Sequence, residues 1–210
     1  MPYGLYLLNI EFLGSEAALT RAMARISPGR REKAGRFRLD SDKRLWVGAG
    51  LLIERVLDLL DAQGAQRQQG YLPSGRPFLP AFPRIGISIS HSGAYALAAC
   101  CDGPVGADVQ TRVTDPGKLL RLLSEEELAF CQKDPAGVTR LWALKEAYGK
   151  YTGEGLSYPP PHIRFDGERP YMPGLPCRLY GYPPIEEHFI ACCLEGEKPP
   201  LTLLAPEDVL

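Results

Sequence analysis

The sequence predicts an α+β protein built as a pseudo-symmetric pair of similar α+β subdomains. Of its 210 residues 45% are apolar, enough for a core in one domain or in two small ones. Helical and strand patterns follow one another along the chain, and two tripeptides recur in the same order. These are Arg-Leu-Trp at 44–46 and 140–142, and Ala-Cys-Cys at 99–101 and 191–193. We therefore expect two related units, 1–103 and 104–210, with a functional site at their interface.

The first half opens with a strand pattern followed by helices. Residues 3–13 are expected to form a strand, and Ser15 can cap a helix that ends at Pro28-Gly29. A long amphipathic helix is then expected from about Asp42 to Ala62, which would place Arg44 in its first turn.

Basic residues gather between these two helices. Residues 30–44 contain seven basic and three acidic side chains in a chain whose net charge is −1. Helix N-termini and arginine side chains both bind phosphate well, so this segment is a candidate phosphate site. A solvated basic surface is the alternative that the segment alone favours.

The middle of the chain predicts a hairpin followed by a further strand. Residues 85–90 alternate between isoleucine and small residues, and 94–101 are almost wholly apolar, so the chain is expected to turn at Ser92-Gly93. A strand at 105–110 would present Asp108 and Gln110 on one face, because side chains two residues apart point the same way.

The second half is organised around a helix at about 140–152. Glu146 and Lys150 are four residues apart and so share one face, where a plain surface ion pair is the simplest interpretation. Gly153 is expected to end this helix. A Ser124-to-Glu127 capping box precedes it, and short strands are expected later, near 162–165, 178–182 and 188–194.

Composition excludes several classes of protein. The net charge of −1 and the pI near 6.3 argue against nucleic-acid binding over the whole surface. No segment is apolar for long enough to span a membrane, and the first residues lack a basic targeting region, so a cytoplasmic location is expected. The six cysteines include no Cys-x-x-Cys, which favours buried, reduced thiols over disulfides or zinc ligands.

Four short motifs occur in a characteristic order. They are Gly75-Arg-Pro77, Ile87-Ser-Ile-Ser-His-Ser-Gly93, Val105-Gly-Ala-Asp-Val-Gln110 and Trp142-Ala-Leu-Lys-Glu-Ala-Tyr-Gly-Lys150. In order and spacing they resemble the two-domain, surfactin-type 4′-phosphopantetheinyl transferases, over residues 28–157. The resemblance implies that family's α+β fold. It also implies a magnesium-dependent transfer of the phosphopantetheine arm of coenzyme A to a serine of an acyl or peptidyl carrier protein, with release of adenosine 3′,5′-bisphosphate.

The resemblance also implies roles for individual residues. Cationic and polar side chains would hold the phosphates and the adenosine end of coenzyme A: Arg30, Lys33, Arg44, Arg76, Ser90 and His91. Asp108 and Glu146 would hold Mg²⁺, or Mn²⁺ in its place, since such ions prefer oxygen ligands. Gln110 stands where the family usually has a second acid, so one negative charge is missing. Glu146 would also take the serine proton, and Lys150 would neutralise charge on the transferred phosphoryl group or the leaving bisphosphate.

Two alternatives remain open at this stage. A nucleic-acid-binding module would use the basic run at 30–44, with Phe37 or Trp46 stacking on bases, but the acids Asp108 and Glu146 oppose it. A family member that binds coenzyme A but has lost catalysis is suggested by Gln110. A chain that contains both halves of a pseudo-dimer is expected to be a monomer, with coenzyme A and a carrier protein as partners, and no nucleic acid or membrane.

Overall fold

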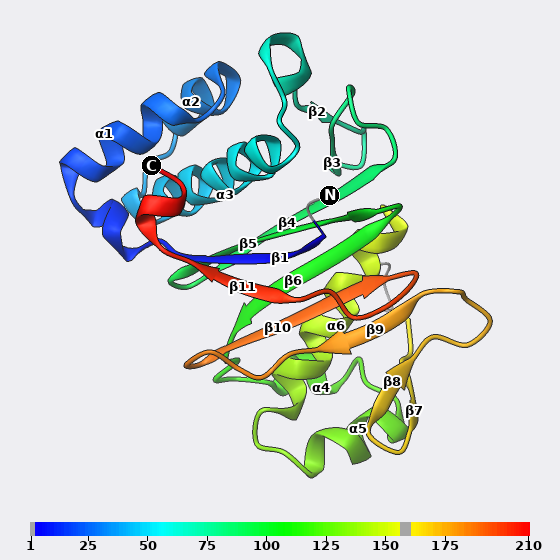
Figure 1. Cartoon of the computed structure of the whole chain (residues 1–210). Helices are drawn as coiled ribbons and strands as arrows, with labels where there is room; N and C mark the ends of the chain where they lie inside the picture. The colour runs from blue at the N-terminus through cyan, green and yellow to red at the C-terminus, as the bar shows by residue number, and fades with distance from the viewer. Residues whose placement is uncertain (1–2, 156–160) are drawn as a thin grey trace.

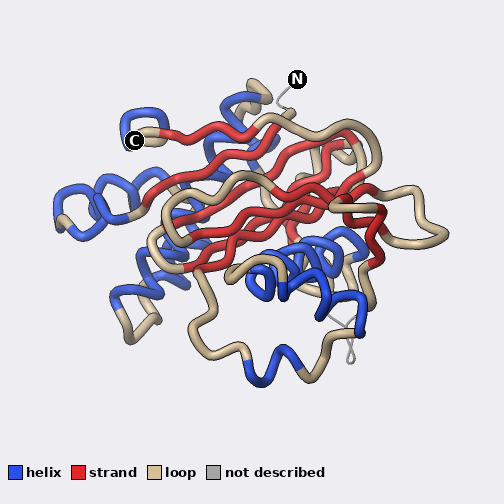
Figure 2. Tube along the Cα trace, turned by 90° about the horizontal axis from the view of Figure 1, so that it is seen from below, coloured by secondary structure: helices blue, strands red, loops and turns tan. Residues whose placement is uncertain are grey.

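The computed structural model describes residues 3–155 and 161–210, and it has two main β-sheets with helices on both sides (Figures 1 and 2). The first sheet has the order β11 (Leu201–Leu204), β1 (Gly4–Asn9), β5 (Tyr95–Asp102), β4 (Ile85–Ser92). The second has the order β6 (Val105–Thr111), β10 (His188–Leu194), β9 (Arg178–Gly181), β8 (Arg169–Tyr171), β7 (Arg164–Asp166). A two-stranded ribbon joins β2 (Gly70–Tyr71) to β3 (Pro77–Phe78). The architecture is therefore α+β, as the sequence predicts.

The helices divide between the two sheets. Those preceding β4 are α1 (Glu16–Arg25), α2 (Pro28–Ala34) and α3 (Asp40–Leu59), and those between β6 and β7 are α4 (Gly117–Leu120), α5 (Glu125–Gln132) and α6 (Gly137–Thr152). Single 3₁₀ turns are η1 (Glu11–Gly14), η2 (Gly64–Arg67) and η3 (Pro206–Asp208). Helix α3 packs against β5 and β4, whereas α6 packs against β6 and β10. Within the described residues, no helix has the length and apolar character needed to cross a bilayer.

The strands bury both of their faces. In β5, Leu97 and Ala99 join residues of β6 and β10 in one central cluster, whereas Ala96 and Ala98 face the cluster under α3. Alternation with a period of two explains why one strand supplies both cores. All six cysteines are buried and unpaired, which confirms the expectation of reduced thiols.

Helix α6 approaches β6 closely because of one glycine. A Cβ atom on Gly106 would collide with the carbonyl oxygen of Ala147, so only glycine lets the helix backbone lie this near the strand. The helix ends at Gly153, whose φ of 78° is left-handed, as the sequence predicts. The close contact between Gly106 and Ala147 sets how near α6 lies to Asp108.

Several local predictions are confirmed and three are wrong. The strand expected over residues 3–13 ends at Asn9, and a 3₁₀ turn follows it at Glu11–Gly14. The hairpin turns between β4 and β5 at the expected place, and Ser124 and Glu127 form the reciprocal capping box. Pro28, however, begins α2 instead of ending α1, because proline is well tolerated in the first turn of a helix, where its missing N–H costs nothing. Helix α3 begins at Asp40, so Arg44 lies in its second turn and not its first.

The two halves repeat one order of elements. Strand β1, helix α3 and strands β4 and β5 correspond in sequence to β6, α6, β9 and β10, and in each half the first strand pairs antiparallel with the last. Strand β11, from the end of the chain, pairs parallel with β1 and so extends the first sheet (Figure 1). The division into subdomains at residue 103 stays a prediction.

Candidate active site

Strands β4 and β6 run side by side where the two sheets meet. Serine hydroxyls of β4 take the place of part of the backbone ladder: Ser88 Oγ accepts from the N–H of Ala107, and Ser92 Oγ accepts from the N–H of Thr111, each at 3.0 Å. The seam fixes β6 beside β4. It therefore determines where Asp108, between these two contacts, presents its carboxylate.

The carboxylate of Asp108 is the centre of the site. Its side chain lies on the face of β6 that packs against α6, and it is only 4% exposed. Its Oδ1 accepts from Ser90 Oγ at 2.6 Å and from Lys150 Nζ at 2.7 Å. Its Oδ2 is buried and has no hydrogen-bond partner within residues 3–155 and 161–210. A buried, open carboxylate oxygen is costly unless a ligand uses it.

Lys150 does not pair with the glutamate on its own helix. Its ammonium group also donates to the carbonyl of Ala107 at 3.2 Å, so both of its contacts are with β6. Glu146, one turn earlier, makes no ion pair in the part of the chain that the structure describes. Burial raises the pKa of Glu146, the nearby Asp108 carboxylate raises it further, and Lys150 partly offsets both effects. The simple surface ion pair is therefore replaced by two neighbouring carboxylates and one lysine.

These side chains suit a hard divalent cation. Asp108 and Glu146 are close enough for one charge to raise the pKa of the other, and the half-buried Gln110 shares the face of Asp108 on β6. No group of three or more His, Cys, Asp or Glu side chains that could hold a metal occurs within the described residues. Magnesium commonly takes only one or two carboxylates, with waters and substrate phosphates as its other ligands. Two carboxylates with one open oxygen fit that pattern.

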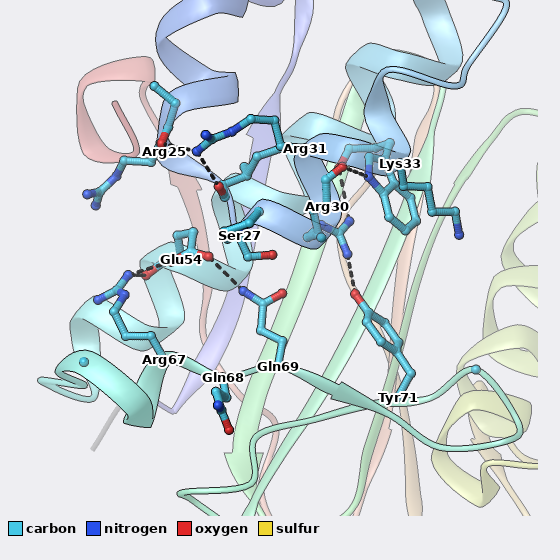
Figure 3. Close-up of a pocket in the computed structure, with 17 residues that line it drawn as sticks. Arg25, Ser27, Arg30, Arg31, Lys33, Glu54, Arg67, Gln68, Gln69 and Tyr71 are labelled. Carbon is cyan, nitrogen blue, oxygen red and sulfur yellow. Dashed lines mark hydrogen bonds and ion pairs between the residues drawn. The ribbon is translucent and has the colours of Figure 1, made fainter.

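A cavity of about 1030 Å³ lies between α2, α3 and the ribbon of β2 and β3 (Figure 3). Arg30 extends from α2 toward this ribbon and donates to the hydroxyl of Tyr71 at 2.6 Å and to the carbonyl of Trp46 at 3.1 Å. Its guanidinium also lies 4.0 Å from the centroid of the Trp46 ring. The ammonium of Lys33 lies 4.2 Å from that centroid. The indole therefore holds two cations at one cavity.

Arg30 is unlike an ordinary surface arginine. It is 5% exposed, its Nε has no partner within the described residues, and burial lowers its pKa. The family resemblance already names Arg30 as a residue that would hold coenzyme A, but nothing in the sequence pattern identifies Tyr71 as its hydrogen-bond partner.

A second cavity, of about 220 Å³, lies between the Arg76 loop, β4 and the end of α6. Arg76 and Lys150 both line it, and Arg76 donates to the carbonyl of Tyr151 at 3.1 Å. Burial lowers the pKa of Arg76. Gly75 lines both cavities, so the two are neighbours across this loop.

His91 lies among the charged groups of the site, whereas Arg44 lies elsewhere. Desolvation of the His91 ring by the surrounding protein lowers its pKa. The positive charges of Lys150 and Arg30 lower it further, and the negative charge of Asp108 opposes them. Arg44 donates to the carbonyl of Asp40 on its own helix at 3.2 Å, and its guanidinium is directed toward Gly14. It lines neither cavity. The structure thus gathers all the predicted site residues except Arg44 around the two cavities and the α6–β6 contact.

Known proteins with similar sequences are phosphopantetheinyl transferases. The model of the 4′-phosphopantetheinyl transferase superfamily matches residues 104–171. A 4′-phosphopantetheinyl transferase of Bacillus subtilis is 30% identical over 207 residues, which cover 91% of this chain and 90% of that protein. The 4′-phosphopantetheinyl transferase Sfp of Bacillus subtilis (strain 168) is 31% identical over 66% of this chain and 65% of its own length.

A mammalian protein is similar over a smaller part of its length. The L-aminoadipate-semialdehyde dehydrogenase-phosphopantetheinyl transferase of Mus musculus is 27% identical over 74% of this chain and 57% of its own length. The fold, the clustered site and the match over 90% of the Bacillus subtilis protein agree. The chain belongs to the 4′-phosphopantetheinyl transferase superfamily, and within it to the surfactin-type group.

Proposed function

We propose that this protein transfers the phosphopantetheine arm of coenzyme A to a serine hydroxyl of an acyl or peptidyl carrier protein. The observation that carries this proposal is the buried Asp108, whose Oδ2 has no partner within the described residues, whose Oδ1 is bonded to Lys150 and whose charge raises the pKa of Glu146, next to cavities lined by cations. Family membership supplies the reaction class, and these contacts supply groups of the right chemistry.

Coenzyme A would bind across the two cavities. Its pyrophosphate and 3′-phosphate carry about four negative charges near neutral pH, which must be met by cations. Arg30 and Lys33 line the larger cavity, and Arg76 and Lys150 line the smaller one. Gly75 belongs to both, so one extended ligand could contact both groups of cations. Ser90 and His91 lie on β4 between them.

Asp108 and Glu146, assisted by the amide oxygen of Gln110, would hold the magnesium ion. When bound, it supplies positive charge that offsets the negative charge of the pyrophosphate. Ser90 and Lys150 already occupy Oδ1 of Asp108, so Oδ2 is the oxygen left for this purpose.

Glu146 would act as the base. The serine oxygen forms a bond to the β-phosphorus of coenzyme A, the bond from that phosphorus to the oxygen of adenosine 3′,5′-bisphosphate breaks, and the serine proton passes to Glu146, directly or through a water. A carboxylate whose pKa is raised by burial accepts a proton more readily than an ordinary one. Lys150 would stabilise the charge that develops on the transferred phosphoryl group or on the leaving bisphosphate.

The intact mass of a recombinant apo acyl carrier protein tests this proposal. After incubation with this protein, coenzyme A and Mg²⁺, the carrier should gain the mass of one phosphopantetheine arm, and EDTA should abolish the gain. The variant Asp108→Asn should behave like the EDTA control, because its amide lacks the negative charge that binds the cation. Carriers of several biosynthetic classes that all keep their mass would reject the proposal.

Gln110 favours a second candidate, in which the chain binds coenzyme A but no longer catalyses transfer. An amide in place of a carboxylate removes one negative charge from the metal site. If this candidate is correct, coenzyme A binds normally, the parent protein is inactive and Gln110→Glu restores transfer. An active parent protein rejects it.

A further inference from the structure

Two cysteines of the second half lie side by side. Cys193 belongs to β10, where it pairs opposite Leu179, and Cys177 comes directly before β9, two positions ahead of Leu179. Both are free thiols in the cluster that includes the buried face of α6. Their side chains are in contact, because the S–H of Cys193 donates a hydrogen bond to the sulfur of Cys177. A disulfide needs two sulfur atoms in contact on nearby backbones, and this pair meets that need.

Cys177 also lines a cavity at the surface. The connection between β8 and β9 encloses about 330 Å³, and Cys177 lines this space together with Arg169 and Arg178. Both arginines are exposed. Cys177 is 5% exposed, whereas Cys193 is fully buried behind it. A reagent in the cavity therefore meets Cys177 first, and oxidation reaches Cys193 through Cys177.

The hydrogen bond between the two thiols makes their reactivities unequal. It lowers the pKa of Cys177 against the opposing effect of burial, and it raises the pKa of Cys193, which burial raises further. The thiolate is the form of cysteine that attacks a disulfide, so Cys177 is the nucleophile of the pair. Cys131 lies in the same cluster, but burial raises its pKa to about 11 and leaves it a poor nucleophile.

We propose that Cys177 is an oxidation site for a small anionic disulfide and that it passes the oxidation on to Cys193. The positive charges of Arg169 and Arg178 at the cavity favour an anionic reagent. This site lies outside the coenzyme A cavities, and the inference does not depend on the proposed function.

The reaction proceeds in two exchange steps. The thiolate of Cys177 attacks one sulfur of the small disulfide, which forms a mixed disulfide and releases one small thiolate. Cys193 then attacks the sulfur of Cys177, and its proton passes to the second small thiolate as that group leaves. Two protein thiols and one small disulfide thus become one protein disulfide and two small thiols. The small disulfide is the oxidant, so electrons balance.

Counting of thiols by mass spectrometry tests the proposal on the folded protein, with glutathione disulfide as the anionic reagent. After this treatment, denaturation and alkylation, the parent should carry two alkyl groups fewer than its six cysteines allow. Trypsin cleaves after Arg178, so the new disulfide should link the separate peptides that contain Cys177 and Cys193. A treated parent that keeps all of its thiols, or that links a different pair, would overturn the proposal.

Single variants separate the two steps. Cys193→Ser keeps a donor to Cys177 but removes the second sulfur, so it should stop at the mixed disulfide and gain the mass of one glutathione. Cys177→Ala should keep all of its remaining thiols. The matched control is Cys131→Ala, which removes a thiol from the same cluster and should still form the disulfide. Glutathione attached to Cys193 in Cys177→Ala would contradict the order of steps. If Cys177→Ala does not fold, Cys177→Ser takes its place.

The charge of the reagent tests the role of the two arginines. Cystamine is also a small disulfide, but it carries positive charges. Relative to the rates in urea-unfolded protein, glutathione disulfide should oxidise the folded parent faster than cystamine does, and equal relative rates would overturn the anionic preference. None of these measurements involves coenzyme A or a carrier protein, so their outcome is distinct from that of the carrier assay.

Discussion

The ammonium group of Lys150 lies 2.7 Å from Oδ1 of Asp108, so the lysine of α6 pairs across to β6 and not with Glu146 on its own helix. This contact exists because Gly106 lets α6 lie close to β6. It leaves Glu146 without an ion pair within the described residues, and burial and the nearby Asp108 charge raise the pKa of Glu146, with Lys150 offsetting them in part. Four predictions follow from the groups around this pair and from a second buried pair.

Replacing Lys150 should separate metal binding from catalysis. In Lys150→Met, Asp108 loses its positive partner, so a divalent cation should bind at least as tightly as in the parent. Transfer should nevertheless be slower by about a hundredfold or more, because a cation that stabilises developing charge is lost. Titration with Mn²⁺ and the value of kcat measure the two effects. A variant that loses metal affinity and keeps kcat would contradict this account.

Binding of coenzyme A should take up a proton at His91. The pKa of the free ring is held below its ordinary value of about 6.5, so His91 is neutral at pH 7. A bound phosphate favours the charged ring and raises its pKa, so affinity should increase as the pH falls toward 6. Calorimetry in buffers of different ionisation heat should detect proton uptake in the parent and less in His91→Gln. Equal uptake in both proteins would show that another group titrates.

Glu146→Gln should stabilise the protein in EDTA while it abolishes transfer. Because the folded pKa of Glu146 is raised, its charged form is disfavoured in the folded state, and the parent loses stability relative to the variant as the pH rises through that folded pKa. For a chain of this length, each 1 kcal/mol corresponds to about 2–4 °C in Tm. Thermal unfolding at pH 4 and pH 8 should show the larger difference at pH 8. A difference in Tm between the variant and the parent that grows toward acid pH would contradict a raised pKa for Glu146.

The pair Lys145 and Glu127 should contribute to stability. Both side chains are fully buried, their charged atoms are 2.5 Å apart, and Glu127 also accepts from the N–H of Ile163 at 2.8 Å. Burial acts to raise the pKa of Glu127, but hydrogen bonds from Lys145, Ser124 and Ile163 hold it below its ordinary value. Lys145→Met should cost about 3–5 kcal/mol in the free energy of unfolding, because it leaves a buried carboxylate without its partner.

Urea unfolding of Lys145→Met, of Glu127→Gln and of the double variant measures this cost. Glu127→Gln with Lys145→Met should be more stable than Lys145→Met alone, since no charge is then left unpaired in the interior. The contribution of ionised Glu127 to the free energy of unfolding should also disappear as the pH falls through the lowered pKa of this group in the folded state. A double variant as unstable as the sum of the two single variants would contradict this explanation.

The sequence predicts those parts of the fold and site that depend on local patterns. The β4–β5 hairpin, the capping box at Ser124 and the glycine end of α6 follow from short-range rules, and the structure confirms them. Asp108 and Gln110 share one face because the period of a strand is two. The resemblance of the four motifs to the transferase family names most of the remaining site residues from the sequence alone.

The parts that escape prediction depend on contacts between distant segments. Residue spacing offers only neighbours on the same helix, so it suggests Glu146 as the partner of Lys150, when the partner lies on β6. Arg30 is buried because α3 has a glycine beneath it: a Cβ on Gly50 would lie 2.9 Å from Arg30 Nε. Nothing within the basic segment distinguishes this arginine from its solvated neighbours. The hydrogen bond of Ser90 to Asp108 likewise requires the relative placement of two sheets.

Measurement of both products of one reaction tests the central claim most directly. Apo carrier protein, coenzyme A and Mg²⁺ are incubated with this protein, and the modified carrier and adenosine 3′,5′-bisphosphate are quantified together. We predict equal amounts of the two, with neither formed in EDTA or by Asp108→Asn. Bisphosphate released without carrier modification, or no reaction in a protein that binds coenzyme A and Mn²⁺, would contradict the proposal that this site transfers phosphopantetheine.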